Sequence, residues 1–294
     1  MTFKGGIEAS GTPATTGGGR GGLIAGGGLG SLVLVGLFLL LGGNLGDLGG
    51  VLGGGQDPTG SAGGQERPLE GCKTSDDANT KPECRVAFTG QSVDKVWEKI
   101  LPEQAGIEYK APGRHIFTGQ ASTGCGAASS STGPFYCPRD KTAYFDVSFF
   151  NQLKKLGGDN APLAQEYIVA HEFGHNIQNL EGTLGLSDYN NPGEDSNAVK
   201  IELQADCYAG IWAHYADKGE DAMLEKITPE QVKDAVETAG AVGDDNIQRR
   251  TQGDVSPESW THGSSEQRQK AFLSGYNEGK MSACDTLGRG KYKA

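Results

Sequence analysis

Two histidines and a glutamate lie within five residues of this chain, at a spacing that suits zinc chemistry. His171, Glu172 and His175 form a His-Glu-x-x-His segment. On a helix the two histidines would lie one turn apart on the same face and could bind one zinc ion, with the glutamate close enough to move protons for an activated water. The alternative is two core histidines satisfied by hydrogen bonds, and it is disfavoured because further parts of a zinc site follow along the chain.

A pair of acidic residues further along the chain is expected to supply the third zinc ligand. Glu202 and Asp206 are four residues apart, and Glu202 lies twenty-seven residues beyond His175, which leaves room for a loop and a second helix. Catalytic zinc usually has three protein ligands and one open position, so we expect Glu202 to be the third ligand. Asp206 would then accept the free N–H of a ligand histidine. Two alternatives stay open: Asp206 as ligand with Glu202 behind it, or His214 as ligand.

The metzincin arrangement is excluded by two residues. It needs glycine at position 178 and a third histidine at position 181, where this chain has Gln178 and Glu181. Gly182 is instead typical of the residue just past a helix end. We therefore predict an active-site helix over 163–180 and a third-ligand helix over 197–217.

Several separated segments together resemble a bacterial family of membrane-anchored neutral zinc metallopeptidases. The segments that carry the resemblance are 133–138, 167–175, 202–214, 261–268 and 284–285. The resemblance covers roughly residues 68–290. It implies a zinc-dependent peptidase of the gluzincin type, with an α+β, zincin-like catalytic domain that is dominated by helices and has a small mixed sheet.

The N-terminal part of the chain has the composition of an anchor and a tether. Half of the 48 glycines lie in the first 64 residues, and no charged residue occurs between Arg20 and Asp47. A membrane helix needs ~20 apolar residues. We therefore expect a Gly-rich N-terminus at 1–22, one transmembrane anchor at 23–43, a Gly-rich linker at 44–66 and the peptidase domain at 67–294.

The charges around the apolar segment set its expected direction. Lys4 and Arg20 precede it, so the positive-inside rule places the N-terminus in the cytoplasm and the catalytic domain on the periplasmic side of the cytoplasmic membrane. A cleaved signal peptide is the competing interpretation. It is disfavoured because no small-residue cleavage pattern follows Leu41.

Six cysteines support an extracytoplasmic domain, because an oxidising compartment is where disulfides form and persist. All six lie beyond the anchor, and no Cys-x-x-Cys metal spacing occurs. Six cysteines allow fifteen connectivities. Our interpretation pairs neighbours, as Cys72–Cys84, Cys125–Cys137 and Cys207–Cys284.

Other local patterns predict further elements. Ser92 is expected to cap a helix over 93–101, and the aromatic and β-branched run 142–150 is expected to form a strand. This strand could offer an edge to substrate or be buried; the resemblance slightly favours the edge. Thr228 is expected to cap a helix that begins at Pro229, and a last helix is expected over 264–277.

His262 is the candidate to stabilise the oxyanion of the reaction, because a donor opposite the zinc is needed there. A loop histidine can equally be solvated, and Tyr208 and His214 are weaker candidates. His115 is interpreted as structural.

These observations predict a zinc endopeptidase of the cell envelope, with Zn²⁺ as cofactor and a peptide or protein as substrate. Glu172 is the predicted general base. A non-catalytic zinc-containing binding or scaffold protein of the envelope is the alternative. The net charge of −11 disfavours nucleic acid as a ligand.

Overall fold

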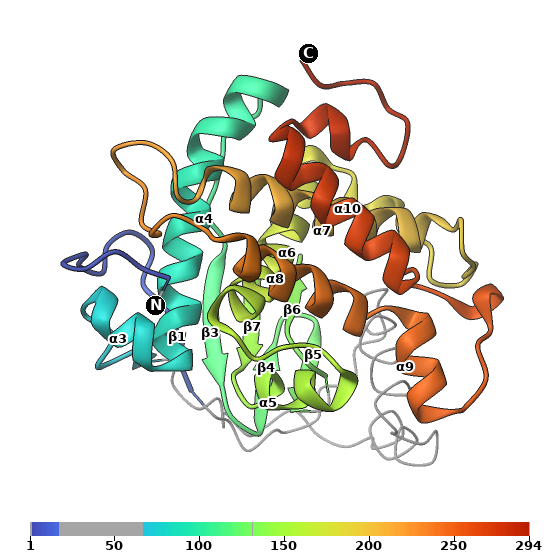
Figure 1. Ribbon diagram of the computed structural model, residues 1–294, viewed down its shortest axis with the longest axis horizontal. Helices are drawn as coiled ribbons and strands as arrows, with labels where there is room; N and C mark the ends of the chain where they lie inside the picture. The colour runs from blue at the N-terminus through green and yellow to red at the C-terminus, as the bar shows by residue number, and fades with distance from the viewer. Residues whose placement is uncertain (1, 18–66, 131, 294) are drawn as a thin grey trace, which may run out of the picture.

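The computed structural model describes residues 2–17, 67–130 and 132–293, so the predicted anchor at 23–43 and linker at 44–66 lie outside the described residues. Within the described ranges, no helix combines the length and apolar character that a bilayer crossing needs. The architecture is α+β, with many helices around one small mixed sheet, as the sequence predicts (Figure 1).

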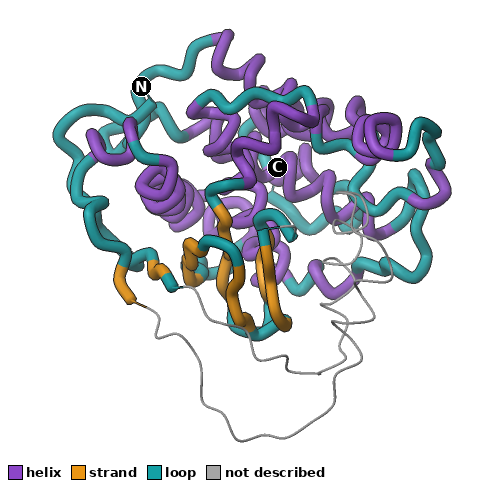
Figure 2. Tube along the Cα trace, turned by 90° about the horizontal axis from the view of Figure 1, so that it is seen from below, coloured by secondary structure: helices purple, strands orange, loops and turns teal. Residues whose placement is uncertain are grey.

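The main sheet is built from five short strands in the order β2–β1–β3–β7–β6. Figure 2 shows the strands gathered on one side of the molecule, next to the helices. β3 is parallel to β1 and β7, while β2 and β6 are antiparallel to their neighbours. A separate antiparallel hairpin joins β4 to β5. The strands are β1 (Thr15–Thr16), β2 (Arg67–Pro68), β3 (Gly113–Phe117), β4 (Gln120–Thr123), β5 (Gly126–Ser129), β6 (Phe135–Cys137) and β7 (Thr142–Asp146).

The predicted strand over 142–150 is shorter than expected and does not form an edge. β7 ends at Asp146, whose carboxylate accepts a hydrogen bond from the Ser148 backbone N–H at 2.8 Å and turns the chain. The chain then enters α5 (Phe149–Leu153) and η1 (Lys154–Leu156). Because β6 pairs with the outer side of β7, the expected edge role of this strand is wrong, and β6 forms the edge.

Two long helices carry the zinc-binding motif residues, and their bounds agree with the sequence prediction to within two residues. α6 (Pro162–Glu181) begins with proline in its first turn and ends at Gly182, which has a φ of 71°. α7 (Asn197–Tyr215) begins after Ser196, whose hydroxyl accepts from the Val199 N–H. Gly174 brings the two helices close, since a Cβ there would lie 3.0 Å from the Ala205 backbone.

The predicted helix start at Ser92 is wrong. α4 (Pro82–Ala105) begins ten residues earlier, with proline in its first turn, and Ser92 lies inside it. The Ser92 hydroxyl is buried and accepts a hydrogen bond from the indole N–H of Trp212 at 3.1 Å. Ser92 therefore connects α4 to α7 instead of capping a helix.

Three further helices close the fold, namely α8 (Pro229–Ala241), α9 (Asp244–Thr251) and α10 (Ser265–Glu278). α8 and α10 have complete capping boxes, formed by Thr228 with Gln231 and by Ser264 with Gln267. The predicted starts of both helices are therefore confirmed.

Residues 2–17 belong to the same folded unit as residues 67–293. β1 pairs with both β2 and β3, and Phe3 is only 2% exposed. A short helix, α3 (Ser75–Thr80), contacts this segment through the hydroxyl of Ser75, which accepts from the Ile7 N–H.

All six cysteines are paired, and the predicted connectivity is confirmed. The disulfides are Cys72–Cys84, Cys125–Cys137 and Cys207–Cys284. The third ties α7 to η4 (Met281–Cys284) near the C-terminus.

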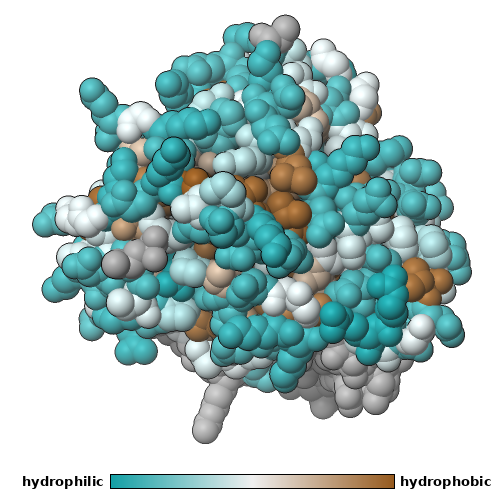
Figure 3. All heavy atoms as spheres, viewed as in Figure 1, coloured by the Kyte–Doolittle hydropathy of each residue, from teal (hydrophilic) through white to brown (hydrophobic). Residues whose placement is uncertain are grey.

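Apolar side chains are concentrated inside the molecule. Among the described residues the large apolar side chains that stand exposed are Leu186 and Val255. The face in Figure 3 is accordingly mainly hydrophilic, with a small apolar group near its centre.

We expect Gly275→Ala to destabilise the fold by about 3 kcal/mol, because α7 and α10 touch through glycine. A Cβ at position 275 would lie 1.9 Å from the Cys207 carbonyl oxygen, and one at Gly210 would lie 2.1 Å from that of Phe272. Urea unfolding would measure the loss. The exposed Asn277→Ala on the same helix is the matched control and should change stability by less than about 0.5 kcal/mol. Equal stabilities of the two variants would contradict the close packing.

Candidate metal centre

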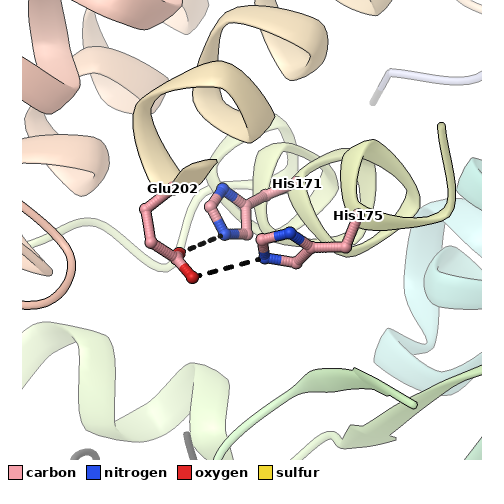
Figure 4. A group of neighbouring side chains, drawn as sticks. All are labelled: His171, His175 and Glu202. Atoms are coloured by element: carbon pink, nitrogen blue, oxygen red, sulfur yellow. Dashed lines mark ion pairs between the residues drawn. The ribbon is translucent and has the colours of Figure 1, made fainter. Parts of the chain in front are cut away.

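His171, His175 and Glu202 meet at one point between α6 and α7 (Figure 4). His171 Nε2 lies 3.3 Å from Glu202 Oε2, and His175 Nε2 lies 3.7 Å from Glu202 Oε1. One donor atom from each side chain lies within 4.8 Å of the other two. Two donors bound to one tetrahedral zinc at 2.0–2.1 Å lie about 3.3 Å apart, so the donor types and their spacing fit zinc.

The carboxylates around the histidines set the charges of this group. The nearby His175 and His171 hold the pKa of Glu202 well below its usual range, against the opposing effect of burial. Asp206 raises the pKa of His171 to about 10, again against burial. Because a ligand histidine must be neutral, binding of a metal ion here would displace a proton from His171.

Asp206 lies behind the group and orients His171. Its Oδ1 is 2.8 Å from His171 Nδ1 and accepts a hydrogen bond from the Tyr167 hydroxyl at 2.6 Å. Arg268 of α10 donates to both carboxylate oxygens, from Nε at 2.8 Å and Nη2 at 3.0 Å. Arg268 and His171 hold the pKa of Asp206 at about 2 although burial opposes this. This leaves Nε2 of His171 free for the metal.

Gln178 gives His175 an equivalent support that the sequence did not identify. Its Oε1 is 2.8 Å from His175 Nδ1, and its amide nitrogen donates to the Ile201 carbonyl at 2.7 Å. The signal lay in the spacing, because residue 178 is one turn beyond residue 175 on the same helical face.

Glu172 lines the same cavity as the three candidate ligands. It is 7% exposed, and burial raises its pKa. A carboxylate whose pKa is raised is better matched to accepting and returning a proton near neutral pH.

His262 reaches this cavity from the loop before α10. Asp244, the first residue of α9, lies with Oδ1 3.2 Å from His262 Nδ1. Its other oxygen accepts from the backbone N–H groups of Thr261, His262 and Gly263. Asp244 raises the pKa of His262 against the effect of burial. His262 is therefore held in place by a buried acid.

Tyr189 is a hydrogen-bond donor at this site that the sequence analysis missed. Its hydroxyl donates to Glu202 Oε1 at 3.3 Å, from the loop that follows η2 (Leu184–Leu186) and lines the cavity. Burial and the Glu202 carboxylate raise its pKa, so the hydroxyl keeps its proton. Nothing local in the sequence marks this loop tyrosine.

Two other candidates point away from the cavity. His214 Nδ1 lies 2.6 Å from the Tyr276 carbonyl oxygen, near the far end of α7. The Tyr208 hydroxyl donates to Glu181 at 2.8 Å. Neither residue lines the cavity that contains the histidine pair.

The cavity next to the candidate ligands has a volume of about 370 Å³. One wall is contributed by Phe135 and Tyr136 of the edge strand β6. The other includes Ile168 on α6, with Val242 and Ile247. The lining is mainly apolar, and its charged side chains include Glu172, Arg268 and the candidate ligand Glu202.

Comparison with known proteins identifies relatives whose activity is undescribed. Rv2575 of Mycobacterium tuberculosis, an uncharacterized protein, is 50% identical over 225 residues, which are 74% of this chain and 75% of the relative. The uncharacterized protein YpfJ of Escherichia coli is 39% identical over 192 residues, which are 64% of this chain and 65% of the relative. No solved structure matches significantly.

The family comparison covers almost the whole chain. Residues 6–287 match the family described as "Putative neutral zinc metallopeptidase". The match includes both helices that carry the candidate ligands, the His262 loop and the six cysteines. The chain therefore belongs to this zinc metallopeptidase family.

Proposed function

We propose that this protein is a zinc-dependent endopeptidase that hydrolyses peptide bonds in the cell envelope. The observation that carries the proposal is Glu172, a buried carboxylate placed in the same cavity as the candidate ligands His171, His175 and Glu202. Three disulfides support an oxidising compartment such as the envelope.

The residues have separate roles in this proposal. His171, His175 and Glu202 hold the zinc ion, which when bound acidifies a water molecule and polarises the scissile carbonyl. Glu172 accepts the proton of the attacking water and returns it to the leaving nitrogen. Asp206 and Gln178 keep the two imidazoles in orientation.

The developing oxyanion needs donors on the substrate side of the ligands. The protonated ring of His262 can donate from Nε2 while its Nδ1 faces Asp244. The Tyr189 hydroxyl can donate a hydrogen bond to the same oxyanion once its hydrogen bond to Glu202 is broken. Of these two donors, His262 is the one that is held in place before the reaction, which is the arrangement that stabilises such a charge most effectively.

The cavity favours an extended peptide with an apolar side chain. β6 is the outer strand of the sheet and lines the cavity, so a substrate segment can pair with its free edge. The apolar walls at Ile168, Val242 and Ile247 then suit an aliphatic or aromatic side chain next to the cleaved bond.

The alternative, a non-catalytic zinc protein of the envelope, fits the geometry less well. A structural zinc site uses a fourth protein ligand. Among the described residues, the metal-binding group contains three, and it borders a cavity.

The Glu172→Gln variant is expected to bind zinc normally and to lose peptidase activity by roughly 10³-fold, because only the proton acceptor is removed. His171→Ala should lose both zinc and activity. The measurement is metal content by mass spectrometry together with cleavage of a mixed peptide library by the full chain. Glu230→Gln, an exposed change on α8, is the control and should behave as wild type. Full cleavage by Glu172→Gln would reject the mechanism.

Asp244→Asn is expected to move the alkaline limb of the kcat/KM profile to lower pH. Asp244 raises the pKa of His262, so the protonated donor persists to higher pH in wild type. Without the carboxylate the donor loses its proton earlier, and activity at pH 8 should fall about tenfold more than activity at pH 6. His262→Ala, which removes the titrating ring, is the control. An unshifted limb in Asp244→Asn would show that His262 does not supply it.

Zinc affinity is expected to rise about tenfold for each pH unit between pH 7 and pH 9, because binding displaces one proton from His171. Chelator competition on the full chain would measure the slope. Asp206→Asn lowers the pKa of His171 toward its ordinary value, so its slope above pH 7 should be nearly flat. The same slope in both proteins would contradict the assigned role of Asp206.

A further inference from the structure

Thr2 and Phe3 are buried against α4 and α6. Phe3 packs edge-on against Phe88 of α4, with ring centroids 5.8 Å apart. The Asn79 side chain accepts from the Thr2 and Phe3 N–H groups at 3.0 and 3.1 Å, and its amide donates to the Phe3 carbonyl at 3.0 Å. The Glu225 N–H donates to the Thr2 carbonyl at 2.7 Å. These contacts fix the positions of residues 2 and 3 on the domain.

The rest of the segment follows the domain as far as the sheet. Ser75 N donates to the Ile7 carbonyl at 2.8 Å, and Ala9 N donates to the Lys73 carbonyl at 2.9 Å. Thr15 then aligns with His115 of β3, and the two side chains meet at 2.9 Å. Residues 2–17 are thus attached at both ends and in the middle.

The segment also contacts a buried charge on the zinc-binding helix. The Thr2 hydroxyl donates to the carboxylate of Glu166, which is fully buried on α6 five residues before His171. Arg85 Nε lies 4.0 Å from the same carboxylate. Within the described chain, Glu166 Oε2 and Arg85 Nε have no hydrogen-bond partner. Burial raises the pKa of Glu166 to about 7, so loss of Thr2 would leave a poorly compensated acid behind the metal centre.

The three disulfides of residues 67–293 are typical of a domain in an oxidising compartment. A segment that forms strand pairs and a core contact with that domain must be in the same compartment when the domain folds. This conflicts with the topology expected from the charges around 23–43, in which residues 1–22 and the domain lie on opposite sides of the membrane.

We propose that residues 2–17 are an integral part of the folded domain, docked in cis, and lie on the same side of any membrane as residues 67–293. The proposal rests on the packing of residues 2–17 and does not depend on peptidase activity.

The first test locates the segment in intact cells that make the full chain. Ser10→Cys and Asn277→Cys, both at exposed positions, would be labelled separately with a membrane-impermeant maleimide. The proposal is supported if both positions are labelled to the same extent in intact cells, or if both are labelled only after permeabilisation. Labelling of Asn277→Cys in intact cells with Ser10→Cys reached only after permeabilisation would overturn it.

The second test measures docking in the purified full chain. Trypsin cleavage after Lys4 should be at least tenfold faster in Phe3→Asp than in wild type, because a charge replaces the buried ring. Ser10→Asp, an exposed change in the same segment, should be cleaved as slowly as wild type. Cleavage of wild type as fast as Phe3→Asp would overturn docking. A stable dimer by light scattering that becomes monomeric in Phe3→Asp would overturn docking in cis.

Discussion

The buried carboxylate of Asp206 is the constraint on which the candidate metal centre depends. It contacts a ligand histidine and a tyrosine of α6 and the guanidinium of Arg268 on α10, while it belongs to α7 itself. Removing one partner of such a buried pair costs about 3–5 kcal/mol, because the remaining charge stays without compensation. The three helices are therefore held in one relative position, and that position brings Glu202 to the histidines.

The glycine contacts have the same consequence by a different route. Gly174 lets α7 approach α6, and Gly210 and Gly275 let α10 approach α7 until backbones touch. Close approach shortens the distance that Arg268 must span to reach Asp206. A second buried acid, Asp244, acts in a similar way on the loop before α10. It contacts the His262 ring and accepts hydrogen bonds from three backbone N–H groups of that loop.

Residues 2–17 also support α6, although the sequence analysis placed the domain at residues 67–294 only. Thr2 contacts Glu166 on α6, Phe3 packs against Phe88 on α4, and β1 widens the sheet beside β3. Phe3 and Ile7 are isolated large apolar residues near a Gly-rich stretch, with no periodicity to mark them. The role of Phe3 depends on a pocket formed by residues distant in the chain.

The sequence by itself determined the metal centre's local parts, because His171, Glu172 and His175 lie within about one helical turn and Glu202 and Asp206 within another. It also indicated the starts of α8 and α10, which depend on neighbouring residues. The cysteine pairing was one of fifteen possibilities, and the fold decided it by bringing together residues as distant as Cys207 and Cys284. Only the tertiary structure decided that Glu202 approaches the histidines, that Tyr189 and Gln178 join them, that β7 is interior and that Ser92 bonds Trp212. Those outcomes depend on contacts between segments far apart in the chain, which no local spacing encodes.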